Sequence, residues 1–295
     1  MSLLSSPQGT PDRIWSLIGG LAALGGSASR RDYDALLNPG YVSDGVEVQA
    51  KEALAGDTHS AIKSLDITEA VGSGEVKLTI EPPESAQMFA DQLHDRLLSP
   101  ANDSDAVILE AYASLLVACD AEGGAEWIYE KGRNEQANEL NKALAGGSGN
   151  AMNATKMASW QRWLAFLGLG TAIPLTQETA DFPSPARRLA RELERAGLAR
   201  QTVLSASDFA ALLAQRMPYL DGGKLFAQAC QRRGHSPMAG RFSPLVSAAL
   251  RDLHDAQVIK LVPSGDAASR LRLTEDPAHP INAFTTVTIF PETGI

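Results

Sequence analysis

Near the start of the chain, apolar residues recur every three or four positions, which predicts an amphipathic helix. Its apolar face consists of Ile14, Leu17, Ile18, Leu21 and Leu24. Thr10-Pro11-Asp12 is a favourable start, because Thr can cap, Pro suits the first helical position and Asp complements the helix dipole. Gly25-Gly26 ends this helix, and a shorter one, opened by Ser29 and Asp32, stops at Asn38-Pro39-Gly40.

A third helical stretch ends at residues 61–65, and the pattern then changes from helical to alternating. Residues 67–71 and 76–80 predict two strands of a hairpin that turns at Gly72-Ser73-Gly74. Three helices followed by a hairpin is the order of a winged helix, a member of the helix-turn-helix class. We therefore expect residues 1–83 to form an N-terminal winged helix.

A similar ending returns near the C-terminus, where Ala249-Leu250-Arg251-Asp252-Leu253 matches Ala61-Ile62-Lys63-Ser64-Leu65 in pattern. Residues 258–262 and 271–274 are the expected strands, joined by a loop at Pro263-Ser264-Gly265-Asp266. The preceding helices are expected at residues 207–216, at residues 222–233 and from Ser243-Pro244 onward. The hairpin after each copy supports a repeat, so residues 201–295 are predicted to be a second winged helix.

Residues 84–200 show helical periodicity and no strand pattern. An aromatic stripe on one of these helices, Trp160, Trp163, Leu164 and Leu167, is typical of core packing. The run Pro185 to Arg195 predicts a solvated amphipathic helix with Glu and Arg pairs. A third helix-turn-helix could occupy Asn153 to Pro174. The expected fold is mainly α, of the α+β class, with tandem winged-helix modules flanking an all-helical middle domain.

Composition indicates a folded protein of two or three domains, because 44% of the 295 residues are hydrophobic. No apolar run approaches the roughly 20 residues of a membrane helix, and the start of the sequence lacks the pattern of a signal peptide. We expect a cytoplasmic protein without a membrane partner. Cys119 and Cys230 each lie in a helical apolar pattern, which favours buried thiols over a disulfide framework.

The formal net charge of −9 hides an asymmetry between the two halves of the chain. Residues 1–150 contain 10 Lys+Arg and 23 Asp+Glu, whereas residues 151–295 contain 16 and 12. An overall acidic protein is a poor candidate for a large nucleic-acid footprint. A polyanion should nevertheless prefer the C-terminal half.

A search for catalytic chemistry gives no candidate. The histidines lack metal-binding spacing, and neither cysteine lies in a CxxC motif; the five are His59, His94, His235, His254 and His279. Gly146-Gly147-Ser148-Gly149 lacks the Lys-Ser/Thr ending of a phosphate loop, and no GxSxG elbow is present. The pairs Asp32 with Asp34 and Asp103 with Asp105 lie beside helix starts, where acidic residues are favoured. We expect no enzyme, no metal and no cofactor.

A winged helix that reads DNA places its third helix in the major groove, with Arg, Lys, Asn or Gln exposed. In the C-terminal copy the expected exposed positions are nearly neutral: Ser247, Arg251, Asp252, His254 and Asp255. Basic residues surround that helix, which suits contacts to phosphate without sequence preference. The candidate nucleic-acid-binding residues are Arg232, Arg233, Arg241, Arg251, Arg270 and Arg272.

The N-terminal copy should repel DNA. It offers few basic groups against a larger acidic set, namely Arg30, Arg31 and Lys63 against Asp32, Asp34, Asp57, Asp66 and Glu69. We therefore expect the N-terminal module to pack against protein. The C-terminal module either contacts a phosphate backbone or also binds protein.

Three segments resemble DpdG-type proteins: residues 5–17, Asn38-Pro39, and Asn153-Ala154-Thr155-Lys156 leading into residues 160–168. Such proteins belong to bacterial gene clusters that place 7-deazaguanine derivatives in DNA and restrict unmodified phage DNA. The resemblance implies an accessory component of an antiphage defence system that acts beside larger ATPases or nucleases. It supplies no functional residues to carry over.

Two hypotheses follow, and an enzyme is a distant third. In the first, the protein is a non-catalytic adaptor that bridges the subunits of a defence or DNA-processing complex and holds double-stranded DNA without sequence preference. In the second, it is a transcriptional regulator that reads an operator, although the third helix is not basic. A variant of the first is a winged-helix subunit of a chromosome-partitioning-like complex, for which homodimerisation would be expected.

Overall fold

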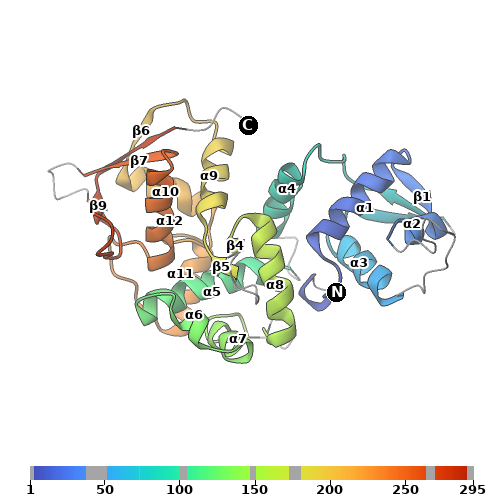
Figure 1. Ribbon diagram of the computed structural model, residues 1–295, viewed down its shortest axis with the longest axis horizontal. Helices are drawn as coiled ribbons and strands as arrows, with labels where there is room; N and C mark the ends of the chain where they lie inside the picture. Colours follow the sequence, from blue (N-terminus) through green and yellow to red (C-terminus); the bar gives the residue numbers. More distant parts are fainter. Residues whose placement is uncertain are drawn as a thin grey trace. The chain divides into compact units, whose positions relative to one another are not determined.

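The computed structural model describes residues 3–37, 52–72, 74–99, 105–146, 151–172, 181–263 and 270–290 (Figure 1). These residues combine helices with small antiparallel sheets, which confirms the expected α+β class. None of the described helices has the length and apolar character needed to cross a membrane. The chain divides into two compact units, residues 1–108 with 155–167 and residues 109–154 with 168–295. The expected domain boundaries near residues 83 and 200 stay predictions.

The N-terminal module, which we define as residues 10–80, lies in the first unit. Its described elements are α1 (Pro11–Ala23), β1 (Ser27–Ser29), α2 (Arg30–Leu37), α3 (Glu52–Ser64), β2 (Thr68–Val71) and β3 (Glu75–Leu78). Strand β3 lies between β1 and β2 and pairs antiparallel with both. The expected helices and hairpin are confirmed. The sequence pattern missed β1, a three-residue strand that is too short to show alternation.

Local interactions explain where these helices begin. Thr10 lies at the N-cap of α1 as expected, although its side chain makes no capping hydrogen bond. The Ser29 hydroxyl accepts from the Asp32 backbone N–H at 3.1 Å and donates to the Asp32 carboxylate at 2.7 Å. This reciprocal contact fixes the start of α2. The apolar face of α1 then supplies the core of the module, because Ile14 and Leu17 are buried.

The rest of the first unit consists of short helical segments and α8. These are η1 (Leu3–Ser5), α4 (Ala86–Leu98), the start of α5 (Val107–Glu122) and α8 (Ala154–Leu167). The buried Asp105 accepts from the Leu3 backbone N–H at 2.7 Å and from the Ser64 hydroxyl at 2.5 Å, so it ties the chain start to the end of α3. The aromatic stripe of α8 is buried as expected, and Trp160 Nε1 donates to the Ile108 carbonyl at 2.9 Å.

The second unit contains a feature that contradicts an all-helical middle region. Besides α6 (Trp127–Glu130), α7 (Arg133–Asn141) and α9 (Ala186–Arg195), it includes an antiparallel pair, β4 (Gly170–Ala172) with β5 (Asp181–Pro183). Gly168 adopts a φ of +78°, which lets the chain turn from α8 into β4. The described part of residues 153–174 therefore holds one helix and one strand, not a third helix-turn-helix.

The C-terminal module, which we define as residues 200–290, also lies in the second unit. Its described elements are β6 (Thr202–Ser205), α10 (Ala206–Arg216), α11 (Lys224–Arg233), α12 (Pro244–Asp255), β7 (Ile259–Val262), β8 (Leu271–Arg272), β9 (Ala283–Phe284) and β10 (Thr286–Ile289). The three expected helices are confirmed to within two residues. Strand β10 lies between β6 and β7 and pairs antiparallel with both.

The expected C-terminal hairpin is wrong in its second strand. β7 pairs with β10, whereas β8 pairs with β9 and its backbone also joins Gly240 and Phe242. The reason is packing, since Val287 and Ile289 on β10 are fully buried and complete the core beneath the helices. Their alternation with Thr286 and Thr288 is a strand signal that the sequence reading overlooked.

In both modules the same kind of turn ends the last helix, α3 or α12. The Ile67 N–H donates to the Ile62 carbonyl at 3.2 Å, and the Val258 N–H donates to the Leu253 carbonyl at 2.9 Å. In each case the preceding residue, Asp66 or Gln257, is left-handed, with a φ of 51° or 60°. Both turns are Schellman motifs. They equate Ile62 with Leu253, so the two matched sequence pentads are out of register by three residues.

Candidate nucleic-acid interface

The outward side of α12 differs from the expectation. Ser247 and Arg251 are buried, whereas Asp252 and Asp255 are exposed. The Ser247 hydroxyl accepts from the Thr274 N–H at 2.9 Å, because the segment after β8 covers this side of the helix. Ser247 and Arg251 were expected to be exposed because they lie off the apolar face of this helix.

Arg251 is held in place by backbone and amide oxygens. Its guanidinium donates to the carbonyls of Ile281 at 3.1 Å and Thr274 at 2.7 Å, and to Asn282 Oδ1 at 3.1 Å. Burial lowers the pKa of Arg251 from its usual value, and nearby Asp276 opposes that shift. Its Nε and Nη2 atoms donate to this fixed set of three acceptors, so Arg251 fastens the segment between β8 and β9 to α12.

Arg233, in the last turn of α11, is bound to acidic residues. It pairs with Glu139 on α7, and its Nη2 atom lies 3.6 Å from Glu122 Oε1 on α5. Burial tends to raise the pKa of Glu139, but hydrogen bonds from Lys142 and Arg233 outweigh it and leave that pKa below its usual value. Because only 10% of the Arg233 side chain is exposed, its charge is largely satisfied inside the second unit.

Asp120, near the C-terminal end of α5, binds one further candidate, Arg241, and also His235. Arg241 Nη2 lies 2.8 Å from its Oδ1 atom, and His235 Nε2 lies 2.7 Å from its Oδ2 atom. The Asp120 side chain is only 3% exposed, so this carboxylate is buried and needs both partners. The sequence search missed it, because Asp120 lies more than a hundred positions before His235 and Arg241.

A second buried carboxylate, Asp221, caps α12. It accepts from the Ser243 backbone N–H and from the Ser243 hydroxyl, each at 2.7 Å. Burial raises the pKa of Asp221 to about 6, with Asp120 adding to the rise and the Ser243 hydrogen bonds opposing it. Ser243 was expected only as a helix start. Its cap is built by a residue 22 positions earlier in the sequence.

The remaining candidates, Arg232, Arg270 and Arg272, are exposed. None of the three forms an ion pair with a residue in the described part of the chain. Arg272 lies in β8, where its backbone accepts from the Phe242 N–H at 2.9 Å and donates to Gly240 at 2.8 Å. These hydrogen bonds place Arg272 beside the loop that leads into α12. The six candidates therefore divide into three held by internal partners and three that face solvent, which we call the rim arginines.

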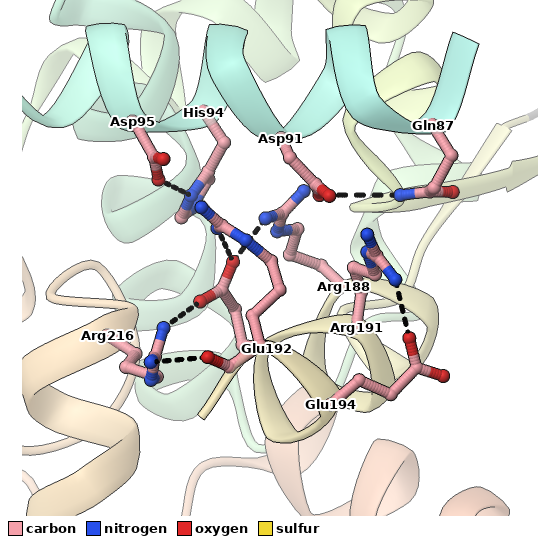
Figure 2. A network of polar contacts seen from close by, with 10 residues as sticks. Gln87, Asp91, His94, Asp95, Arg188, Arg191, Glu192, Glu194 and Arg216 are labelled. Atoms are coloured by element: carbon pink, nitrogen blue, oxygen red, sulfur yellow. Dashed lines mark hydrogen bonds and ion pairs between the residues drawn. The ribbon is translucent and has the colours of Figure 1, made fainter. Parts of the chain in front are cut away.

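The charged helix α9 is also bound internally. Glu192 accepts from Arg188, from Arg195 at 2.6 Å and from Arg216 of α10 at 3.0 Å (Figure 2). Arg191 pairs with Glu194 at 2.7 Å as expected, but Arg188 and Glu192 are buried, so the expectation of a solvated helix is wrong at these two positions. Arg216 also donates to the Arg195 carbonyl at 2.9 Å, so this cluster joins α9 to α10. On α4, in the other unit, Gln87 donates to Asp91 at 3.5 Å.

The N-terminal module has a groove of about 430 Å³ with mixed charge. Basic and acidic side chains both line it, among them Arg30, His59, Lys63, Asp66, Glu69 and Glu75. Arg30 pairs with Asp34 at 3.1 Å and contacts His59 at 3.1 Å. Burial lowers the pKa of His59, and the Arg30 charge adds to that shift. Of the expected acidic set, only Asp66 and Glu69 line this groove, and the effect of that set on DNA stays a prediction.

Both cysteines are free and buried, as expected. Burial raises the pKa of Cys119 to about 12 and that of Cys230 to about 11. Because the thiolate is the reactive form, neither thiol has the electrostatic surroundings of a nucleophile. Among the described residues, no group of three or more His, Cys, Asp or Glu side chains is placed to hold a metal ion.

Comparison with known proteins relates this chain to one family. The model of DpdG-like proteins matches residues 1–267, which is most of the chain and covers the first unit and the second unit up to residue 267. No curated protein and no solved structure matches the chain significantly. The match agrees with the resemblance seen in three short segments of the sequence. The chain belongs to the DpdG-like family.

Proposed function

We propose that this protein is a non-catalytic adaptor of a bacterial system that places 7-deazaguanine derivatives in DNA and restricts unmodified DNA. Membership of the DpdG-like family supports a role in that system. In the adaptor role, the protein binds other subunits of a complex and contacts double-stranded DNA through its C-terminal module. Catalysis belongs to those other subunits.

Both modules are proposed to be winged helices. The order of the N-terminal elements, α1-β1-α2-α3-β2-β3 with β3 central, supports this assignment. When α9 is counted with the C-terminal module, which it directly precedes, α9, β6, α10, α12, β7 and β10 follow the same order, again with the last strand central. Helix α11 and the β8–β9 pair are insertions into that plan. Because only the C-terminal module has these insertions, we expect the two modules to bind different partners.

The rim arginines carry the proposal of DNA contact. Arg232, Arg270 and Arg272 are exposed and unpaired within the described chain, while Asp252 and Asp255 occupy the outward side of α12. An acidic helix face is repelled by the phosphates that flank a major groove. Basic groups beside it can still bind phosphate oxygens, which gives affinity without sequence preference. The same acidic face argues against a sequence-specific regulator.

The experiment is fluorescence anisotropy of a labelled duplex of arbitrary sequence at several salt concentrations. We expect wild-type binding to weaken steeply with salt. Arg232→Ala/Arg270→Ala/Arg272→Ala should bind more weakly, with a log–log salt slope smaller by about 2 to 3, since each phosphate contact contributes about 0.9.

The matched control removes three positive charges elsewhere. Arg31, Lys77 and Lys224 are exposed and lie outside the rim. Arg31→Ala/Lys77→Ala/Lys224→Ala should leave the salt slope within about 0.5 of wild type, because the net charge alone does not make contacts. Absence of duplex binding by wild type at low salt, or equal losses in both triple variants, would overturn the DNA contact.

A further inference from the structure

An open pocket of about 470 Å³ lies at the C-terminal end of α12. It is lined by Arg200, His254, Gln257, Ile259, Lys260 and Phe290. Among these described lining residues none is acidic, which sets the pocket apart from the N-terminal groove. We propose that this pocket binds a nucleotide, with its phosphate on Arg200 and Lys260 and its base or sugar against Phe290 and Ile259.

Backbone hydrogen bonds fix the walls of this pocket. The Gln201 N–H donates to the Ile289 carbonyl at 2.8 Å, and the Phe290 N–H donates to the Val258 carbonyl at 2.9 Å. These bonds join the segment before β6, the end of β10 and the start of β7. Arg200, Phe290 and Lys260 therefore project from three segments that are held together before any ligand binds. Such preorganisation reduces the entropy lost on binding.

The pocket offers several hydrogen-bond donors for phosphate oxygens. Arg200 and Lys260 are exposed and form no ion pair with a described residue. The Leu261 N–H donates to His254 Nδ1 at 3.1 Å, so the neutral imidazole carries its proton on Nε2. The C-terminal end of α12 contributes roughly half a negative charge, which opposes an anion. Two full positive charges outweigh it.

Gln257 and the apolar wall narrow the ligand class from any anion to a nucleotide. Gln257 is left-handed, with a φ of 60°, at a helix exit where glycine is the commoner residue. Its amide side chain lines the pocket in spite of that conformational cost. Phe290 is half-buried and offers an aromatic surface on which a base can stack. Inorganic phosphate alone would leave this aromatic and aliphatic side unused.

The first test is calorimetric titration of the full-length protein with adenosine 5′-monophosphate, adenosine and inorganic phosphate. We expect the nucleotide to bind at least tenfold more tightly than adenosine or phosphate. Arg200→Ala/Lys260→Ala should weaken nucleotide binding at least tenfold. Arg31→Ala/Lys77→Ala, which removes the same charge from exposed sites in the N-terminal module, should bind like wild type. No nucleotide binding by wild type, or equal binding by the pocket variant, would overturn the proposal.

A free nucleotide and the 5′-phosphorylated end of a strand present the same chemistry. Two single-stranded oligonucleotides of one sequence, with and without a 5′-phosphate, separate the two sources. At least fivefold tighter binding of the phosphorylated strand, lost in Arg200→Ala/Lys260→Ala, would identify a strand end. Equal binding of both strands, with nucleotide binding retained, would identify a free nucleotide.

The pocket and the rim arginines share no residues, so failure of the nucleotide proposal can be distinguished from failure of the proposed duplex contact. Arg232→Ala/Arg270→Ala/Arg272→Ala should lose duplex binding and keep nucleotide binding. The pocket variant should keep at least half of the duplex affinity. A wild-type protein that binds the nucleotide but no duplex would overturn the proposed backbone contact alone. One that binds duplex but no nucleotide would overturn the pocket alone.

Discussion

The two modules share an order of elements and differ in the chemistry of one equivalent position. At the exit of the third helix the left-handed residue is Asp66 in the N-terminal module and Gln257 in the C-terminal module. Asp66 lines a groove of mixed charge, whereas Gln257 lines a pocket whose described charged residues are basic. The backbone thus creates a hollow beside the same turn in both modules, and the side chains decide what each can bind.

The two modules also differ in their balance of basic and acidic residues. Residues 10–80 contain 6 Lys+Arg and 10 Asp+Glu, while residues 200–290 contain 10 and 7. Excess positive charge in the C-terminal module is reduced further by buried carboxylates, because Asp120 and Glu139 bind Arg241 and Arg233. A count of basic residues therefore overstates the surface available to DNA. The exposed and unpaired arginines measure it better.

The largest effect should come from removing one of those carboxylates. Asp120→Ala leaves Arg241 and His235 without their acceptor, and breaking a buried ion pair costs about 3 kcal/mol. We expect the free energy of unfolding to fall by about that amount in urea denaturation. Asp252→Ala, an exposed acid on α12, should change it by less than about 0.5 kcal/mol. Equal effects of the two substitutions would show that Asp120 does not hold the α11–α12 loop.

Asp221→Asn should raise the free energy of unfolding by about 2 kcal/mol more at pH 7.5 than at pH 4. Its pKa is raised to about 6 from 3.8, so the folded state holds this proton more tightly than the unfolded state. Ionised Asp221 therefore destabilises the fold above pH 6, by up to about 3 kcal/mol, and the penalty fades as the pH falls from 6 to 4. Asp221→Asn removes the charge and keeps an oxygen for the Ser243 N–H. It should stabilise the protein at pH 7.5.

Urea denaturation at pH 7.5 and pH 4 tests whether ionised Asp221 destabilises the fold. At pH 4 the aspartate is protonated in the folded state, so wild type and Asp221→Asn should differ by less than about 0.5 kcal/mol. Asp221→Ala controls for the cap, because it loses both contacts to Ser243 and should destabilise at both pH values. A stabilisation by Asp221→Asn that is the same at pH 7.5 and pH 4 would contradict the raised pKa.

Helices were predictable here because their signals are local. The 3.6-residue pattern and the start signals at Pro11 and Ser243-Pro244 fall within a few residues of the observed helix bounds. The three-residue strands β1 and β4 were not, since they are too short to show periodicity. The β7–β10 pairing spans 23 residues of intervening sequence and depends on which strand fills the core. Proximity in sequence favoured the wrong partner.

The sequence identified the basic residues of the candidate interface but not which of them are free to bind DNA. Basic residues around α12 could be read from the sequence, but the carboxylates that bind Arg233 and Arg241 lie on α7 and α5, about a hundred positions away. Arg251 was assigned to the exposed side because it lies off the apolar face of α12. Its carbonyl partners, Thr274 and Ile281, become visible only when the path from β8 to β9 is known.

Reversing the charge on the outward side of α12 should convert a repelling face into a binding one. Asp252→Lys/Asp255→Lys is expected to tighten duplex binding about tenfold at low salt, and less at physiological salt. Glu69→Lys/Glu75→Lys makes the same charge change in the N-terminal module and should tighten binding no more than about twofold. If both variants gain equally, net charge rather than the position of α12 governs DNA binding, and the proposed division of labour between the modules fails.

The smallest effects should come from the two left-handed turns. Gln257→Gly removes the steric cost of a β-carbon at a φ of 60°, while the extra freedom of glycine in the unfolded chain offsets part of the gain. We expect stabilisation of roughly 0.5 to 1 kcal/mol, and less for Asp66→Gly, because Asp tolerates this conformation better than Gln. Gln257→Ala keeps the β-carbon and should not stabilise.

Nucleotide titration of the same variants separates conformation from contact. Both Gln257→Gly and Gln257→Ala remove the amide, so both should weaken nucleotide binding about threefold, although only the glycine variant becomes more stable. Asp66→Gly should leave nucleotide binding unchanged, since Asp66 lines the N-terminal groove. Retention of full nucleotide affinity by Gln257→Ala would mean that the glutamine is kept at this turn for a reason other than the pocket. The left-handed residue would then mark the shared turn of the two modules and not their difference in ligands.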